Sequence, residues 1–480
     1  MTNHITHWID GKAWTGKAAR TGEVYNPATG KISGTVDFAS PADMDAAIAV
    51  AKRASLEWAA TSLSKRVTIM FAFREILNAR KAELAAIITE EHGKTLPDAL
   101  GEVTRGLEVV EFATGLGHLL KGSFSESVST GIDVYSIRQP LGVVGIISPF
   151  NFPAMVPMWF FPIAIAAGNT VVLKPSEKDP SAAIWIGKLW KEAGLPDGVF
   201  NVLNGDKESV DGLLHSPDVE AISFVGSTPI ARYIYEECAK AGKRVQSLGG
   251  AKNHMLVLPD ADLELVADSA INAGFGSAGE RCMAISVVVA VEPVADALIE
   301  KIVSRMDKLR TGDGRRGCDM GPLVTKEHRD KVAGYIDVAI KDGAKVVVDG
   351  RDVKADGEAA GFWLGPTLID KVPTTSSVYK DEIFGPVLTV QKFTDDAQAL
   401  KWANDVKYGL ASSVWTSNHT RAMRFAKYLD FGAVWINTHI PLVAEMPHGG
   451  FKHSGYGKDL SHYGFEDYTR IKHVMHYIGE

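Results

Sequence analysis

The segment 274–286 places one cysteine, Cys282, among small residues between a helical pattern and an apolar strand pattern. Small neighbours let a substrate carbonyl approach the sulfur, and free backbone N–H groups can hydrogen-bond the resulting oxyanion. The adjacent Arg281 is expected to favour the thiolate and to attract an anionic substrate. Isolated cysteines are more often buried and inert, so a structural cysteine remains the alternative.

A second chemical signal is the turn 223–229, where an apolar strand pattern gives way to a helix at Gly226 and Ser227. Backbone N–H groups and hydroxyls at a helix N-terminus suit a diphosphate, although the G-x-G-x-x-G fingerprint of dinucleotide sites is absent. The alternative is that Ser227 is an ordinary N-cap.

Lys174 and Glu177 follow another apolar strand pattern, at the edge where open α/β sheets bind ligands. The Glu177 carboxylate can accept hydrogen bonds from ribose hydroxyls and would repel a 2′-phosphate, which favours NAD over NADP. A solvated pair at a helix start is the alternative.

Asn151 lies between Pro149 and Pro153, which fix its position in the chain. Its side-chain amide is therefore either a rigid hydrogen-bond donor for an oxyanion or a residue that caps a turn.

Two series of short β-branched runs are expected to position these residues. The first comprises 143–148, 170–174, 199–203 and 221–225, and the second comprises 255–258, 286–291, 345–348 and 433–437. Helix-length patterns between the runs predict an α/β fold with a parallel, Rossmann-type sheet and a second α/β domain beginning near residue 250. Ser40-Pro41 followed by Asp43 predicts the start of a long helical region.

The composition of the chain argues against several classes of partner and site. A chain of 480 residues predicts two or three domains, and a net charge of −7 without a Lys/Arg run disfavours nucleic acid as a partner. Three cysteines without C-x-x-C spacing, and no convincing ligand spacing at His439, His448 and His453, argue against disulfides and metal. The N-terminus lacks a signal or transit pattern, and the apolar run 152–167 is interrupted by prolines, so we expect a cytoplasmic protein that does not span a membrane.

Six motifs occur in the order found in the aldehyde dehydrogenase superfamily, which the chain resembles over nearly its whole length. They are Pro149-Phe-Asn-Phe-Pro153, Lys174-Pro-Ser-Glu177, Phe224-Val-Gly-Ser-Thr228, Leu248-Gly-Gly250, Gly279-Glu-Arg-Cys282 and Glu382-Ile-Phe-Gly-Pro386. The resemblance implies that Cys282 attacks an aldehyde, that Asn151 and the Cys282 amide hold the oxyanion, and that hydride passes to NAD. The cofactor residues that it implies are Ser148, Phe150, Lys174, Glu177, Gly226 and Ser227, with Glu382 and Phe384 on the nicotinamide ribose.

One position departs from the general pattern. Hydrolytic members carry a glutamate directly before Leu-Gly-Gly that activates water, whereas this chain has Ser247. Serine is not a general base near neutral pH, so a thiol such as coenzyme A is the expected acyl acceptor. Residues 1 to about 390 resemble methylmalonate-semialdehyde dehydrogenase, the CoA-acylating branch, and in that branch two arginines matching Arg105 and Arg281 recognise the substrate carboxylate.

The C-terminal part resembles γ-aminobutyraldehyde and betaine-aldehyde dehydrogenases instead, through 408–415, 434–439 and 445–459. We therefore hypothesise a chimera, engineered or naturally recombined, with its junction between about 355 and 400. Asp459 aligns with an acidic position of the hydrolytic active site, although a solvated acid at a helix start is the favoured interpretation.

The expected architecture is a Rossmann-type NAD domain (1–122 and 141–249), an α/β catalytic domain (250–464) and a small β oligomerisation flap (123–140 and 465–480). The expected activity is NAD-dependent oxidation of malonate or methylmalonate semialdehyde through a Cys282 thioester, with transfer to CoA giving acetyl-CoA or propionyl-CoA. The alternatives are a hydrolytic aminoaldehyde dehydrogenase that releases a free acid, and a catalytically silent protein of the same fold. By resemblance we expect a homodimer or homotetramer.

Overall fold

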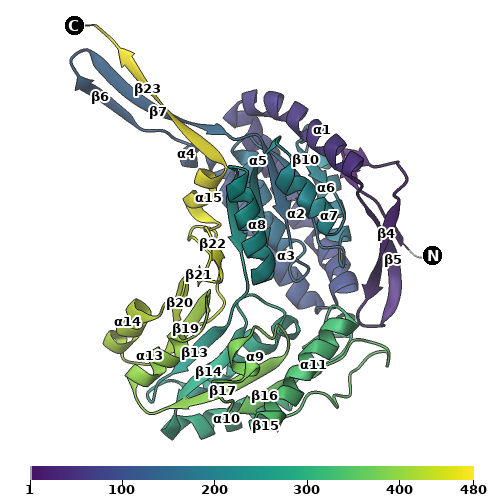
Figure 1. Ribbon diagram of the computed structural model, residues 1–480, viewed down its shortest axis with the longest axis vertical. Coiled ribbons are helices and arrows are strands. Elements are labelled where there is room, and N and C mark those ends of the chain that lie inside the picture. The colour runs from purple at the N-terminus through teal and green to yellow at the C-terminus, as the bar shows by residue number, and fades with distance from the viewer. Residues whose placement is uncertain (1–2, 480) are drawn as a thin grey trace.

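The computed structural model describes residues 3–479 and is built around two large sheets (Figure 1). The first has the order β22-β12-β11-β8-β9-β10-β2-β3, and its central strands β12 to β10 are parallel. Its strands are β2 (Trp8–Ile9), β3 (Lys12–Ala13), β8 (Val143–Ile147), β9 (Thr170–Lys174), β10 (Phe200–Val202), β11 (Val219–Val225), β12 (Arg244–Leu248) and β22 (Gly455–Tyr456). The predicted parallel sheet is therefore confirmed.

Helices cover both faces of this sheet. One face packs against α1 (Pro41–Ala60), α7 (Lys207–His215) and α8 (Thr228–Lys240), and the other against α2 (Leu63–His92), α3 (Leu96–Thr114), α5 (Met155–Ala166) and α6 (Ser181–Glu192). All twelve residues of α5 are buried, as expected for a helix that is apolar on every side. The predicted helix start is confirmed, because Ser40 and Asp43 form a reciprocal capping box at α1.

The second large sheet has the order β15-β16-β17-β14-β13-β19-β20. Its strands are β13 (Asn253–Val257), β14 (Ile285–Val291), β15 (Lys345–Val348), β16 (Thr367–Asp370), β17 (Val387–Phe393), β19 (Ala411–Trp415) and β20 (Ala433–Ile436). It packs against α9 (Leu263–Phe275), α10 (Glu292–Met306) and α11 (Lys326–Lys341) on one face, and against α13 (Asp396–Asn404) and α14 (His419–Tyr428) on the other.

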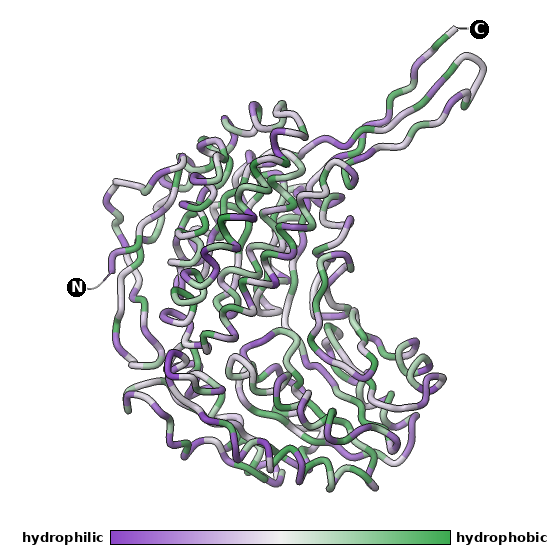
Figure 2. The backbone as a smooth tube through the Cα atoms, turned by 180° about the vertical axis from the view of Figure 1, so that it is seen from behind, coloured by the Kyte–Doolittle hydropathy of each residue, from purple (hydrophilic) through white to green (hydrophobic). Residues whose placement is uncertain are grey.

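A three-stranded sheet projects from the body (Figures 1 and 2). Its strands are β6 (Phe124–Ser129), β7 (Ile132–Pro140) and β23 (Thr469–Tyr477), with β7 antiparallel to both neighbours. The smaller elements are β1 (Asn3–Ile5), β4 (Arg20–Asn26), β5 (Lys31–Phe38), β18 (Tyr408–Gly409), β21 (Phe451–Lys452), α4 (Leu116–Leu119), α12 (Ser377–Lys380), α15 (Ser461–Asp467) and the 3-10 turns Gly276–Gly279 and Gly314–Arg316.

The structure differs from the sequence prediction in several strands. The sequence does not predict β12, β16, β17 or β19, and β15 runs antiparallel to β16 at the sheet edge instead of continuing the parallel series. The division between the two large sheets falls between Leu248 and Asn253, and the assignment of residue ranges to domains stays a prediction. In the described part of the chain, every helix is too short or too polar to cross a bilayer.

Candidate active site

Cys282 lies in the loop that leads from α9 through a 3-10 turn to β14. Ser277, Ala278 and Gly279 are all left-handed, with φ of 48°, 52° and 71°. A side chain on Gly279 would overlap the backbone at Gly385, so only glycine fits this close approach. Asn253 Nδ2 donates to the backbone oxygens of Cys282 and Ala284, both at 2.8 Å, which fixes the cysteine at the start of β14.

Two cavities meet at Cys282, the one residue that lines both. We name the larger, of about 420 Å³, the arginine cavity; it is lined by Pro97, Asp98, Gly101, Glu102, Arg105, Phe152, Met155, Arg281, Cys282, Met283, Ile440, Pro441 and Leu442. The other, the sheet-edge cavity, has about 250 Å³ and is lined by Pro149, Phe150, Asn151, Val225, Gly226, Ser227, Gly249, Gly250, Cys282, His328, Lys331, Glu382 and Phe384.

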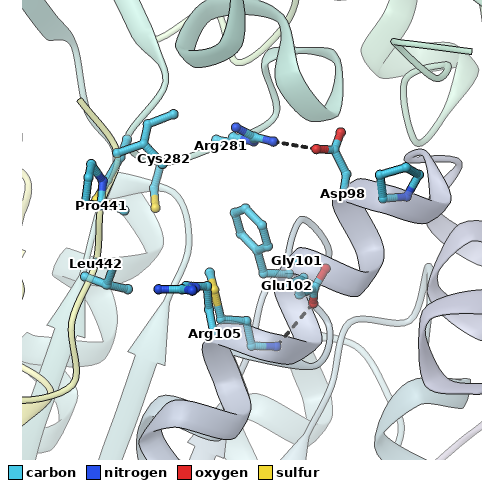
Figure 3. A pocket seen from close by; sticks show the side chains of 13 residues that line it. Asp98, Gly101, Glu102, Arg105, Arg281, Cys282, Pro441 and Leu442 are labelled. Atoms are coloured by element: carbon cyan, nitrogen blue, oxygen red, sulfur yellow. Dashed lines mark hydrogen bonds and ion pairs between the residues drawn. The ribbon is translucent and has the colours of Figure 1, made fainter. Parts of the chain in front are cut away.

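The structure brings both predicted arginines into the arginine cavity. Figure 3 shows the Cys282 sulfur and the Arg105 guanidinium directed into the same space, whereas the Arg281 guanidinium is directed toward Asp98. Arg281 Nη2 lies 2.8 Å from Asp98 Oδ1, and Arg105 Nη2 lies 2.8 Å from Glu108 Oε1 on the same helix. The cavity therefore joins a sulfur nucleophile to two guanidinium groups.

The sheet-edge cavity combines a helix N-terminus with a half-buried carboxyl group. Ser227 occupies the N-cap position of α8, but its hydroxyl makes no capping bond and stays available to an anion. Glu382 Oε1 accepts a hydrogen bond from Ala251 N at 2.9 Å, and burial raises the pKa of Glu382 to about 7. A Cβ on Gly250 would collide with Glu382 Oε2, so the Leu-Gly-Gly motif clears the space beside this carboxyl.

These features fit a dinucleotide. Ser148 Oγ is buried at the carboxyl edge of the sheet without a hydrogen-bond partner among residues 3–479, as expected for a group that meets a ligand. Ser148 N donates to Lys174 O at 3.1 Å, and Lys174 Nζ lies 3.4 Å from Glu177 Oε2. Ser148, Lys174 and Glu177 line neither cavity but lie at the ends of β8 and β9. Lys174 is buried, so the alternative of a solvated pair is wrong for the lysine.

Asn151 is held in place by contacts that the sequence did not predict. Its Nδ2 donates to Glu280 O at 3.1 Å, and its backbone oxygen accepts a hydrogen bond from Lys94 Nζ at 2.6 Å. The same ammonium group lies 2.6 Å from Glu102 Oε2, and both side chains are fully buried. The sequence did contain one signal of these contacts: Glu102 is a charged residue at a core-facing position of α3, and a buried charge needs a partner.

Glu280 forms a buried cluster with two histidines behind the cysteine loop. Its Oε2 lies 3.6 Å from His92 Nε2, its Oε1 lies 3.5 Å from His328 Nε2, and Oε1 accepts a hydrogen bond from Val324 N at 3.3 Å. Burial raises the pKa of Glu280 to about 8 and lowers the pKa of His328 to about 4. His328 Nε2 also lies 2.7 Å from Phe384 O, which links the cysteine loop to the sheet-edge cavity.

The contacts of Arg281 give no support to the expectation that it favours the thiolate, which stays a prediction. Burial raises the pKa of the Cys282 thiol to about 12, and the negative charges of Glu382 and Asp459 raise it further in the same direction. The Arg281 guanidinium is engaged by Asp98 and does not offset these effects. The thiol is therefore protonated at neutral pH until something else lowers its pKa.

The interpretation of Asp459 as a solvated acid is also wrong. Asp459 is 1% exposed, and its Oδ1 lies 2.9 Å from Nδ1 of His448, which is also buried. The two residues also exchange backbone hydrogen bonds of 2.9 and 2.8 Å.

His439 Nε2 lies 3.0 Å from the backbone oxygen of Met283. Within residues 3–479, no group of three or more histidine, cysteine or acidic side chains is arranged to hold a metal ion.

Known proteins share this fold and a large part of the sequence. A model of the aldehyde dehydrogenase family matches residues 14–474. The malonate-semialdehyde dehydrogenase of Pseudomonas aeruginosa is 48% identical over 476 residues, covering 98% of this chain and 95% of the relative. The solved methylmalonate-semialdehyde dehydrogenase of Oceanimonas doudoroffii has a TM-score of 0.97 and 46% identity, covering 100% and 99% of the two chains. A Sinorhizobium meliloti protein described as the same enzyme, solved with NAD, has a TM-score of 0.98 and 46% identity, with the same coverage.

These comparisons overturn the chimera hypothesis. The Pseudomonas relative matches through the tail as well as the early segments, whereas a betaine aldehyde dehydrogenase of Staphylococcus aureus is 31% identical over 99% of the chain. In the tail, Gly449, Gly455 and Gly457 adopt positive φ, and β22, which begins at Gly455, pairs with β12. The predicted α/β fold is confirmed, and the chain belongs to the aldehyde dehydrogenase family.

Proposed function

We propose that this NAD-dependent enzyme oxidises malonate or methylmalonate semialdehyde and transfers the acyl group to coenzyme A. The observation that carries the proposal is the position of Cys282, where a cavity with two arginines meets a cavity suited to a dinucleotide. The relatives named malonate-semialdehyde dehydrogenase, which match over the full chain, support the same substrate class.

In the proposed reaction the Cys282 thiol gives its proton to solvent and its sulfur bonds to the aldehyde carbon. The carbonyl π bond breaks, and Asn151 Nδ2 with the Cys282 backbone N–H stabilises the resulting oxyanion. Arg105 and Arg281 hold the substrate carboxylate in the arginine cavity. Glu382 and Phe384 would hold the nicotinamide ribose, while Ser148, Phe150, Lys174, Glu177, Gly226 and Ser227 would hold the rest of the cofactor. NAD bound there would supply the hydride acceptor; when the adduct carbon loses its hydride, its carbonyl re-forms and a thioester remains on Cys282.

The acyl acceptor follows from Ser247. Its hydroxyl is fully buried and donates to Ala231 O at 2.6 Å, so it lines neither cavity and activates no water. The thiol of CoA attacks the thioester carbon and displaces the Cys282 sulfur, giving an acyl-CoA. The bond to the carboxylate breaks to release carbon dioxide, and the adjacent thioester stabilises the resulting enolate, which takes a proton from solvent. The product is acetyl-CoA from malonate semialdehyde or propionyl-CoA from methylmalonate semialdehyde.

The projecting sheet supports assembly into a homodimer or homotetramer. Large apolar side chains on it are exposed, among them Phe124, Ile471, Met475 and Tyr477, each at 61–67%. A second copy that covers these side chains removes apolar area from water, which favours association.

The test is NADH formation from both semialdehydes with and without CoA, with products identified by mass spectrometry and Cys282→Ser as the control. We expect acyl-CoA products and turnover that collapses without CoA. A free acid formed at equal rates in both conditions would establish the hydrolytic alternative instead.

A further inference from the structure

Asp98, which lines the arginine cavity, contacts both Arg281 and the turn before Cys282. Its Oδ1 accepts a hydrogen bond from Arg281 Nη2 at 2.8 Å, and its Oδ2 accepts one from Ser277 N at 2.9 Å (Figure 3 shows the first). Ser277 begins the left-handed turn before Cys282. A single carboxylate therefore holds both the Arg281 guanidinium at the wall of the arginine cavity and the backbone turn that leads to Cys282.

The other contacts of Arg281 are weak. Nη1 reaches the backbone and side-chain oxygens of Asn272 only at 3.4 Å, and Nε is buried without a hydrogen-bond partner in the described part of the chain. The guanidinium packs over Gly276, where a Cβ would lie 2.6 Å from its central carbon. Without Asp98, nothing of comparable strength in residues 3–479 keeps Arg281 at the cavity wall.

Asp98 is suited to this task by its place in α3. It is the third residue of the helix, and its backbone N–H donates to the N-cap hydroxyl of Thr95 at 3.3 Å. A negative charge is favourable in this first turn. The side chains of Asp98 and Arg281 are 21% and 14% exposed, so solvent screens the pair much less than it screens Arg105 and Glu108, which are 45% and 34% exposed.

The charges lining the cavity also define the substrate. Glu102 is paired with Lys94, Asp98 with Arg281 and Arg105 with Glu108; the Arg105 pair is the most exposed of the three, so solvent screens it most and Arg105 is the guanidinium most easily drawn to a substrate carboxylate. We propose that Asp98 is a positioning residue that gives the enzyme its preference for aldehydes with one carboxylate, by fixing Arg281 against the wall of the arginine cavity. This inference rests on the proposed function, which places the carboxylate there.

The test compares malonate semialdehyde with propionaldehyde, a neutral aldehyde of similar size, in Asp98→Asn. We expect kcat/KM for the semialdehyde to fall about tenfold, mainly through a higher KM, and kcat/KM for propionaldehyde to change less than twofold. Asp98→Glu, which keeps the carboxylate, should recover most of the preference. Glu111→Gln is the matched control, because it removes an exposed carboxylate of the same helix that pairs with Arg74 outside the cavity.

Equal losses on both aldehydes would show that Asp98 only supports the fold and would overturn the inference. A fall in both KM and kcat for the semialdehyde would also overturn it, because Asp98 would then compete with the substrate for Arg281. If wild-type enzyme shows no preference for the semialdehyde, the proposed function fails as well. If wild type has the preference and Asp98→Asn retains it, the role of Asp98 alone fails.

Discussion

Asn151 donates a hydrogen bond from Nδ2 to the backbone oxygen of Glu280, 3.1 Å away. The amide expected to stabilise the oxyanion is thus already tied to the loop that carries Cys282. Because Lys94 holds the backbone oxygen of the same residue, Asn151 is fixed from two sides before any substrate binds. The second N–H of the amide remains for the oxyanion.

Asn151→Ala should lower kcat by about 10²–10³ with little change in KM, because one preorganised oxyanion donor is typically worth that much. Steady-state NADH formation measures the effect. Asn151→Asp, which has nearly the same shape but no donor, should lose at least as much. A loss below about fivefold in both variants would remove Asn151 from the oxyanion site.

Alkylation of Cys282 by iodoacetamide should be slow at pH 7 in the free protein, because burial raises the thiol pKa to about 12. The rate should rise about tenfold per pH unit between 7 and 9, since only the thiolate reacts. Asp459→Asn removes one of the charges that raise this pKa and should increase the rate. Peptide mapping against Cys282→Ser gives the site of labelling, and fast, pH-independent labelling would contradict the protonated thiol.

Glu280 should make the protein less stable as pH rises. Its pKa is raised from 4.5 to about 8 in the folded state, so folding retains a proton between these values and stability falls across this window. Glu280→Gln removes the effect. Its melting temperature relative to wild type should increase from pH 5 to 8 and then level off, whereas parallel melting curves would show that Glu280 does not titrate in this range.

Lys94→Met should destabilise the protein by about 3–5 kcal/mol, because it leaves the Glu102 carboxylate buried without its partner. Activity should fall too, since Lys94 holds the backbone of Asn151. Lys52→Met is the matched control, because Lys52 pairs with Asp218 at the surface, where such a pair is worth about 0–1 kcal/mol. Thermal unfolding of both variants measures the difference, and equal shifts would contradict the buried ion pair.

The sequence predicted the strands whose apolar runs are unbroken. β9 has the expected bounds, and β8 and β14 agree with the prediction to within one residue at each end. β12 was missed because Arg244 and Gln246 interrupt its apolar pattern, and Gln246 is satisfied within the fold by donating to Lys458 O. Such a partner, 212 residues away, leaves no trace in the local pattern.

In the candidate site, too, local sequence patterns could not predict partners that are distant along the chain. Motifs identified Cys282 and the residues beside it, because each motif lies within a few residues of a strand end. The support around them was not predictable: Asp98 and Arg281 are 183 residues apart, and Asn151 and Glu280 are 129 apart. Only tertiary packing brings such partners together, and neither helical nor strand periodicity reports it.

The two cavities share Cys282 and no other lining residue. Substitutions at residues 440–442 can therefore reshape the arginine cavity without changing any residue that lines the sheet-edge cavity. The lining of one cavity can thus change while the lining of the other stays the same. Only a change at Cys282 alters the lining of both cavities at once.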